Sequence, residues 1–345
     1  MPFSELTGQD RALSTLRAAL RAGTLHHALL LAGPEGVGKG TAARILAQAL
    51  NCEAPDRAPD DACGACGPCR KIARGLHPDV LLLQEERTMA RAGRWEPRGG
   101  KTPSKDIVVD QVRDLTDRRL ALRLFEGRRR VVIVDPAEAM NPQAQNALLK
   151  TLEEPPEDTV LCLVSSSADV LLPTIRSRCL RLPFAPLPDA FVASRLEAEG
   201  RPPAEARLAV ALAGGSLGRA LALDTATLAA RREAVEAAAA LPADDAGAWI
   251  AFARAQGEDR EAARETCELL LVWLRDVLVA QAAGEGAGLA LADLAGAARQ
   301  VAGALSPAEV LRRIEQVRLT LGSLRQNAAA GLALERMLIG WFHGC

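Results

Sequence analysis

The stretch from Val131 to Cys179 constrains the fold more than any other part of the chain. It begins with the apolar run VVIVD, turns at Asn141-Pro142 into a helical segment and stops at Pro155-Pro156. Asn is a favourable N-cap, and Pro suits the first helical position. A second apolar run, TVLCLVS, follows, and a short helix then leads to Ser-Arg-Cys at 177–179. This alternation of strand and helix is typical of a parallel α/β sheet.

A strand, a glycine loop and a helix are also predicted earlier in the chain, at HHALLLAGPEGVGKGTAARILAQAL (26–50). Gly33, Gly38 and Lys39 fit the pattern G-x-x-x-x-G-K, in which backbone N–H groups converge on phosphate and the lysine reaches the outer phosphates. Gly40 stands where a Ser or Thr would bind magnesium, and Thr41 follows one position later. We therefore predict a phosphate-loop fold, and the occupancy by ATP or ADP stays open.

The groups that would activate water in an ATPase are incomplete. Asp135 ends a strand at the position that suits the magnesium ligand, but Pro136 follows where a second carboxylate is expected. Glu138 is a candidate substitute base, although a surface charge is the simpler interpretation. The serines at 165–167 lie where a polar sensor would contact the terminal phosphate, or they end the strand. The pattern predicts a degenerate nucleotide site.

Four cysteines lie at metal-ligand spacing in NCEAPDRAPDDACGACGPC. Cys52, Cys63, Cys66 and Cys69 offer two overlapping C-x-x-C steps and one upstream thiol, which suits a tetrahedral Zn²⁺ site. Four thiolates leave no open position for substrate, so the predicted role is structural. Free thiols or a redox pair are the alternative.

Composition excludes several classes of protein. The 345 residues carry 42 basic and 43 acidic side chains, a net charge of −1, which argues against unaided coating of nucleic acid. Four Trp, six Phe and no Tyr leave few base-stacking groups. We find no apolar run long enough to span a membrane and no signal-peptide pattern, so we expect a cytoplasmic protein without membrane contact.

The remaining segments predict further elements. We expect a short helix at 4–23, a strand at 77–83, a mobile polar loop at 85–105 and a helix at 106–124. A proline-rich hinge begins at 183, and helical patterns follow it. From about 236 the chain reads as helices, with an apolar segment at 265–283 and a capping box at Ser306-Pro307-Ala308-Glu309. The apolar faces after this box contain Val310, Ile314, Val317, Leu321 and Leu324, and then Leu334, Met337, Leu338 and Trp341.

The motifs NALLKTLEEPP (146–156) and SRC (177–179) resemble those of bacterial clamp-loader subunits of DNA polymerase III. The resemblance covers residues 1 to about 225 well. It implies an AAA+ P-loop domain with a parallel sheet over 1–183, including an inserted zinc module at about 51–72. It further implies a small helical lid over 184–235 and an all-α collar that joins subunits over 236–345.

The resemblance also implies a function. The chain would be a non-catalytic structural, or stator, subunit whose Arg178 acts in trans as an arginine finger in a neighbour's ATP site. The implied partners are gamma/tau and delta subunits in a hetero-pentamer, together with the sliding clamp and primed DNA. Spacing alone favours a simpler role for Arg178, in which it complements a helix C-terminus or packs at a surface. Relatives that bind ATP place an arginine where this chain has Gly218, with Arg219 one position later.

Two other functions are compatible with parts of the sequence. An active, gamma/tau-like ATPase subunit would share most motifs, but the missing carboxylate and hydroxyl argue against it. A P-loop nucleotide kinase is suggested only by GKGT at 38–41, and the cysteine cluster and helical C-terminal part fit it poorly.

Overall fold

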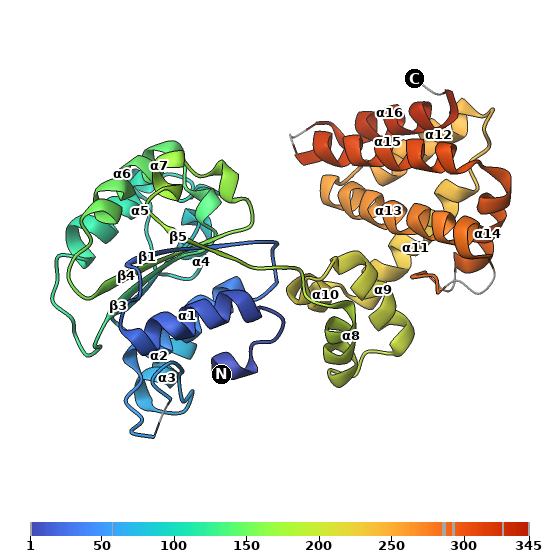
Figure 1. Ribbon diagram of the computed structural model, residues 1–345. Helices are drawn as coiled ribbons and strands as arrows, with labels where there is room; N and C mark the ends of the chain where they lie inside the picture. The colour runs from blue at the N-terminus through green and yellow to red at the C-terminus, as the bar shows by residue number, and fades with distance from the viewer. Residues whose placement is uncertain (1, 57, 285–287, 292–293, 326–327, 344–345) are drawn as a thin grey trace. The chain divides into compact units, whose positions relative to one another are not determined.

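The computed structural model describes residues 2–56, 58–284, 288–291, 294–325 and 328–343, and its contacts divide the chain into two units (Figure 1). The first unit contains residues 1–188 together with 216–218. The second contains residues 189–215 and 219–345. The helices predicted for the lid and those predicted for the collar therefore share one unit, and their separation into two domains stays a prediction.

A five-stranded parallel sheet forms the centre of the first unit. The strands are β1 Ala28–Ala32, β2 Val80–Leu83, β3 Arg130–Val134, β4 Thr159–Ser165 and β5 Leu180–Pro183. Their order across the sheet is β2-β3-β4-β1-β5, and every neighbouring pair is parallel. The predicted parallel α/β sheet is confirmed. Because β1 lies between β4 and β5, the loop after β1 lies beside the ends of the strands from the 131–179 stretch.

Helices cover both faces of this sheet (Figure 1). Alternate side chains of a strand point to opposite faces, so Leu29 and Leu31 enter one apolar core and Leu30 enters the other. The first face is covered by α1 Asp10–Ala22, α2 Lys39–Asn51 and α3 Gly67–Ala73, and the second by α5 Val109–Arg113, α6 Pro142–Glu153 and α7 Pro173–Arg176. Short 3₁₀ turns are η1 Phe3–Glu5, η4 Ala137–Ala139 and η5 Ala168–Val170.

The segment 85–105 differs from the prediction of an unstructured loop. It contains α4 Glu86–Arg91 and η2 Arg98–Gly100. The Glu86 carboxylate accepts hydrogen bonds from the Trp95 indole at 3.1 Å and from the Ser104 backbone at 2.8 Å, so one buried side chain closes the segment on itself. The predicted helix at 106–124 is also shorter: α5 passes into a π-helical stretch, η3 Asp114–Arg119.

The second unit is helical throughout its described secondary structure. Its helices are α8 Asp189–Ala198, α9 Pro203–Ala213, α10 Leu217–Ala222, α11 Thr225–Ala239, α12 Ala246–Gln256, α13 Arg260–Ala283, α14 Ala295–Ala304, α15 Pro307–Arg325 and α16 Ala330–His343. α10 begins in the first unit and continues in the second. The predicted stripes on α15 and α16 enter one core, where Trp273 and Trp341 are almost fully buried. Among the described helices, none is long and apolar enough to cross a membrane.

Candidate functional site

The phosphate loop joins β1 to α2 as the sequence predicted. Gly33 N–H donates to the Ser165 carbonyl at 3.1 Å, which ties the loop to the end of β4. Gly38 is the N-cap of α2, with a left-handed φ of 100° that favours glycine. Lys39 and Gly40 begin α2, and Thr41 is half-buried in its first turn. The strand–loop–helix geometry that a phosphate group would need is therefore present.

Lys39 is bound by its own loop. Its Nζ donates to the Gly33 carbonyl at 2.6 Å and also to the Pro34 carbonyl. The side chain is buried, and this burial lowers the pKa of the ammonium, while the carboxylates of Glu138 and Asp135 oppose the shift. The charge that would reach an outer phosphate is thus directed back into the loop.

The Asp135 carboxylate, predicted as a magnesium ligand, lies beside Gly40. A Cβ atom added to Gly40 would lie 2.6 Å from Asp135 Oδ2, so a Ser or Thr could not replace Gly40 unless Asp135 moved. Burial raises the pKa of Asp135, and the positive charges of Arg44 and Lys39 oppose this.

A distant segment packs onto the tip of the phosphate loop. Residues 216–218 belong to the first unit, and Gly218 N–H donates to the Gly36 carbonyl at 3.0 Å. A Cβ atom on Gly36 would lie 2.2 Å from Ser216 Oγ, and one on Gly218 would lie 3.0 Å from the Gly36 Cα. Both glycines are therefore required by the close approach of two backbones. Gly218, where the family resemblance led us to expect an arginine, makes this contact instead.

Arg219, the alternative sensor, has another partner. Its guanidinium forms an ion pair with Glu268 on α13, and both residues lie in the second unit. In the sequence, Arg219 lies one position after the expected sensor. In the structure, its guanidinium is paired with a carboxylate of α13.

Glu138 is not the surface charge that the sequence suggested. Its Oε1 accepts hydrogen bonds from Ser166, both from the backbone N–H at 2.9 Å and from the hydroxyl. Burial would raise its pKa, but these bonds outweigh burial and lower it. The carboxylate therefore joins the turn after β3 to the turn after β4. It fixes Ser166, one of the three serines predicted as a possible sensor, while Ser165 is fully buried.

Arg178 lies on the surface between α7 and β5. Its Nη2 is 2.6 Å from Oε1 of Glu153, the last residue of α6, and its Nη1 donates to the Thr174 carbonyl at 3.0 Å. The side chain is 36% exposed. Ile175 is fully buried and Cys179 is half-buried in the same core, so the segment is anchored while the guanidinium faces solvent. The two sequence motifs that carry the family resemblance meet in this ion pair.

The four predicted metal ligands converge on one point. The Sγ atoms of Cys52, Cys63, Cys66 and Cys69 all lie within 4.8 Å of one another, with 3.8 Å between Cys52 and Cys66 and 3.9 Å between Cys63 and Cys69. Four sulfurs bound tetrahedrally to Zn²⁺ at about 2.3 Å would be about 3.8 Å apart. The donor set and its spacing fit a structural zinc ion.

The environment of one thiol favours the anionic form that a metal needs. Backbone N–H groups of Cys66 and Ala65 donate to Cys63 Sγ at 3.2 and 3.4 Å. Burial raises the pKa of Cys52 and Cys69, but at Cys63 these hydrogen bonds outweigh burial and lower the pKa to about 6. A thiolate at Cys63 is therefore available at neutral pH to accept a cation.

Comparisons with known proteins agree with these motifs. The family model described as "DNA polymerase III, delta subunit" matches residues 8–188. "DNA polymerase III subunit delta'" of Pseudomonas aeruginosa is 44% identical over 193 residues, which are 55% of this chain and 53% of that protein. The chain belongs to the clamp-loader family of DNA polymerase III subunits.

Further relatives of this clamp-loader chain carry other names. "DNA polymerase III subunit gamma/tau" of Mycobacterium tuberculosis is 31% identical over 363 positions, covering 96% of this chain and 59% of that protein. The chain spans between half and three fifths of the length of these two relatives. The solved structure of a gamma subunit-related protein of Thermotoga maritima aligns with 96% of this chain and 99% of its own, with 19% identity and a TM-score of 0.39.

Two aspartates connect the cysteine cluster of this clamp-loader subunit to its N-terminal segment. Asp60 forms ion pairs with Arg17 at 2.7 Å and Arg21 at 2.6 Å, both on α1. Asp61 Oδ1 accepts the backbone N–H of Phe3 at 2.7 Å. These contacts could not be predicted from the sequence, because aspartates in a polar loop look like ordinary surface residues unless their partners are known.

A second polar network holds the loop between η3 and β3. The Asp79 carboxylate is buried and accepts the backbone N–H groups of Phe125, Glu126 and Gly127 at 2.7–3.2 Å. Asn51, at the end of α2, accepts the next two N–H groups of the loop, those of residues 128 and 129. Two buried side chains thus satisfy five consecutive backbone donors, which fixes the path of the loop into β3.

The acid stability of the first unit should depend on Asp79. Burial raises its pKa, but the donated N–H bonds outweigh burial and hold it below 3.8. The stabilisation is therefore present above about pH 4, the pKa in an unfolded chain, and is lost as the pH falls through the lower folded value. We expect Asp79→Asn to lower the free energy of unfolding at pH 7 by about 2 kcal/mol and to flatten its pH dependence below pH 4.

Chemical denaturation at pH 3 to 7 measures this effect, with the exposed Asp117→Asn as control. If the free energy of unfolding of Asp79→Asn depends on pH as strongly as that of the parent protein, other carboxylates are responsible for the acid sensitivity.

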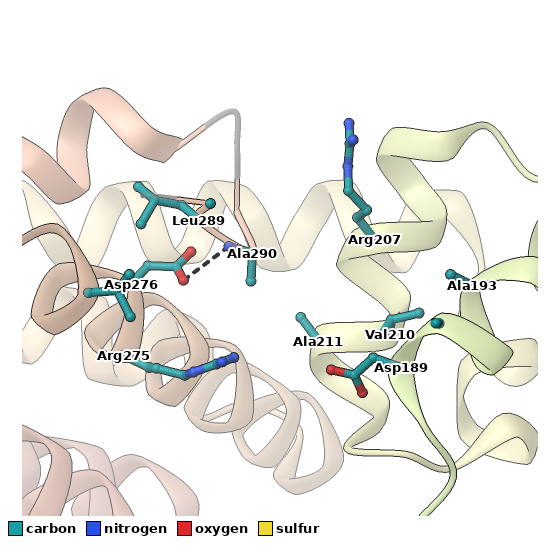
Figure 2. A pocket seen from close by; sticks show the side chains of 12 residues that line it. Asp189, Ala193, Arg207, Val210, Ala211, Arg275, Asp276, Leu289 and Ala290 are labelled. Carbon is teal, nitrogen blue, oxygen red and sulfur yellow. Dashed lines mark hydrogen bonds between the residues drawn. The ribbon is translucent and has the colours of Figure 1, made fainter. Parts of the chain in front are cut away.

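The second unit contains a pocket of about 320 Å³ (Figure 2). Asp189 of α8 and Arg275 of α13 extend into it, and neither forms an ion pair with any part of the chain that the structure describes. Buried Asp276 accepts the backbone N–H groups of Ala290 at 3.1 Å and Leu291 at 2.7 Å, which fixes one wall. None of the residues predicted to bind nucleotide or metal lines this pocket.

Proposed function

We propose that this chain is a non-catalytic structural subunit of the DNA polymerase III clamp loader. In this role it supports ATP-dependent loading of the sliding clamp on primed DNA and lends Arg178 to the nucleotide site of a neighbouring ATPase subunit. Its partners are gamma/tau-like and delta-like subunits, arranged with it in a hetero-pentamer of AAA+ folds. The helices of the second unit supply the contacts that hold the subunits together.

The observation that carries this proposal is the presence of Gly40 and Pro136 where a hydrolytic site has a hydroxyl and a second carboxylate. A hydrolytic site needs the lysine on the outer phosphates, a hydroxyl and a carboxylate for magnesium, and a group that orients water. Here Gly40 replaces the residue that would supply the hydroxyl, and Pro136 replaces the second carboxylate. The Lys39 ammonium donates to the carbonyls of Gly33 and Pro34. The two replacements each remove a group that hydrolysis needs, and together they support a degenerate site.

The trans role of Arg178 has separate support. Its guanidinium is partly exposed, and both of its polar partners, Glu153 and Thr174, lie at the ends of helices on the same surface. A guanidinium in that position can reach phosphate oxygens of another chain, where it would stabilise charge on the transferred phosphoryl group. We also propose that the four cysteines hold one structural Zn²⁺.

A second candidate is an active ATPase subunit of the same complex. The 31% identity to a gamma/tau subunit over 96% of this chain favours it. The two candidates differ in what the purified chain does with ATP.

We expect the isolated chain to hydrolyse ATP at less than about 0.01 per second, whereas typical enzymes turn over at about 1 per second or faster. A purified gamma/tau subunit assayed in parallel is the positive control, and Lys39→Ala detects a contaminating ATPase. Turnover near 1 per second that Lys39→Ala abolishes would replace the structural role with the catalytic one.

A further inference from the structure

Arg178 forms an ion pair with Glu153 on the surface of the first unit. The 2.6 Å contact between Arg178 Nη2 and Glu153 Oε1 uses one edge of the guanidinium, and the Thr174 carbonyl binds the other amino group. Glu153 is 49% exposed and Arg178 is 36% exposed, so water reaches both sides of the pair. An ion pair of this kind is weak and can exchange partners.

The backbone on both sides of the ion pair is anchored by buried residues, whereas the two paired side chains are partly exposed. Leu152, directly before Glu153, is buried, and its carbonyl is 3.0 Å from His27 Nε2. Ile175 is buried on the helix that precedes Arg178. Both ends of the ion pair therefore project from anchored segments, and the guanidinium can leave Glu153 through side-chain rotation alone.

We propose that Glu153 is a positioning residue that holds Arg178 on this chain's own surface until a nucleotide phosphate of a neighbouring subunit displaces it. This inference rests on the proposed trans role of Arg178. Carboxylate and phosphate bind the same edge of a guanidinium, so they compete for it. A triphosphate in a site shielded from water attracts the guanidinium more strongly than a half-exposed carboxylate does. Breaking the ion pair between Glu153 and Arg178 thus costs a small free energy, which weakens nucleotide binding at the neighbouring subunit by the same amount.

The neighbouring Glu154 provides a matched control. It is exposed, it has the same charge, and it forms no ion pair with the described residues. Glu153→Gln keeps the size and polarity of the side chain and removes only the charge. We expect Glu153→Gln to lower the KM for ATP of the reconstituted complex by about two- to fivefold, the effect of one half-exposed ion pair. The kcat should change little, and Glu154→Gln should leave both parameters unchanged.

A double-mutant cycle separates positioning from a general effect on folding. In the Arg178→Ala background, Glu153→Gln should have no further effect, because the residue it holds is absent. If Glu153→Gln leaves KM unchanged with Arg178 intact, or lowers KM equally without Arg178, the positioning role is wrong. If Arg178→Ala itself has no effect on the complex, the proposed trans role is wrong, and the positioning role fails with it. The two failures are therefore distinguishable.

Discussion

Arg178→Ala should sharply reduce ATP hydrolysis by the reconstituted clamp-loader complex and leave this chain folded. An arginine finger is worth about 10³-fold or more in kcat at the site it serves. The neighbouring site should therefore lose nearly all of its ATP hydrolysis, and the total turnover of the complex should fall by the fraction that this site contributes. Clamp loading should fall as well. The fold should survive, because the substitution removes a half-exposed ion pair worth at most ~1 kcal/mol.

Arg176→Ala is the matched control for this experiment. Arg176 lies two residues earlier at the end of α7, its side chain is 35% exposed, and it pairs with Asp169 at 2.8 Å. Arg176 therefore resembles Arg178 in charge and exposure, and differs from it in the residue with which it forms an ion pair. The test measures steady-state ATP turnover and clamp loading on primed DNA for complexes that contain the parent chain, Arg178→Ala or Arg176→Ala. Thermal unfolding of each isolated chain checks that the fold is kept. Equal turnover in all three would refute the trans role of Arg178.

The second large effect is expected at the cysteine cluster. Cys69→Ala removes one of four ligands, and the zinc content of the purified chain should fall from one per chain to nearly none. A structural zinc ion can contribute ~10 kcal/mol in small modules, which is comparable with the net stability of a domain. We expect the Tm of the first unit to fall by at least about 20 °C, because a loss of 1 kcal/mol lowers the Tm of a unit of this size by about 2–4 °C.

Loss of the cluster should also be detected far from it. Asp60 and Asp61 bind α1 and the Phe3 backbone, so hydrogen exchange should accelerate in residues 3–22 as well as near the cysteines. Cys162→Ala, a buried thiol of β4 outside the cluster, serves as control and should keep the zinc. If the parent protein contains no zinc after purification in a medium that contains the metal, the proposed zinc site is wrong.

The sequence predicted those features that depend on local spacing. The glycine loop, the four cysteines and the apolar runs of β1, β3 and β4 each lie within a few dozen residues. Periodicity and ligand spacing suffice to recognise them. The position of Arg178 on a surface segment also followed from its motif, whereas its partner Glu153 did not.

The features that the sequence did not predict depend on contacts between distant residues. The bonds of Lys39 to its own loop cannot be distinguished in the sequence from a lysine ready for phosphate. Asp79 and Asn51 look like ordinary polar residues until the fold brings the loop at 125–129 to them. The helix within 85–105 was missed because its polar composition hides Glu86, which forms bonds only once Trp95 and Ser104 are placed.

The contact between Gly36 and Gly218 limits which substitutions this subunit tolerates at the tip of its phosphate loop. A Cβ atom on Gly36 would lie 2.2 Å from Ser216 Oγ, and one on Gly218 would lie 3.0 Å from the Gly36 Cα. A side chain at either position would have to push the two segments apart. We therefore expect a tolerated change at one of these glycines to be accompanied by a compensating change in the segment that it faces.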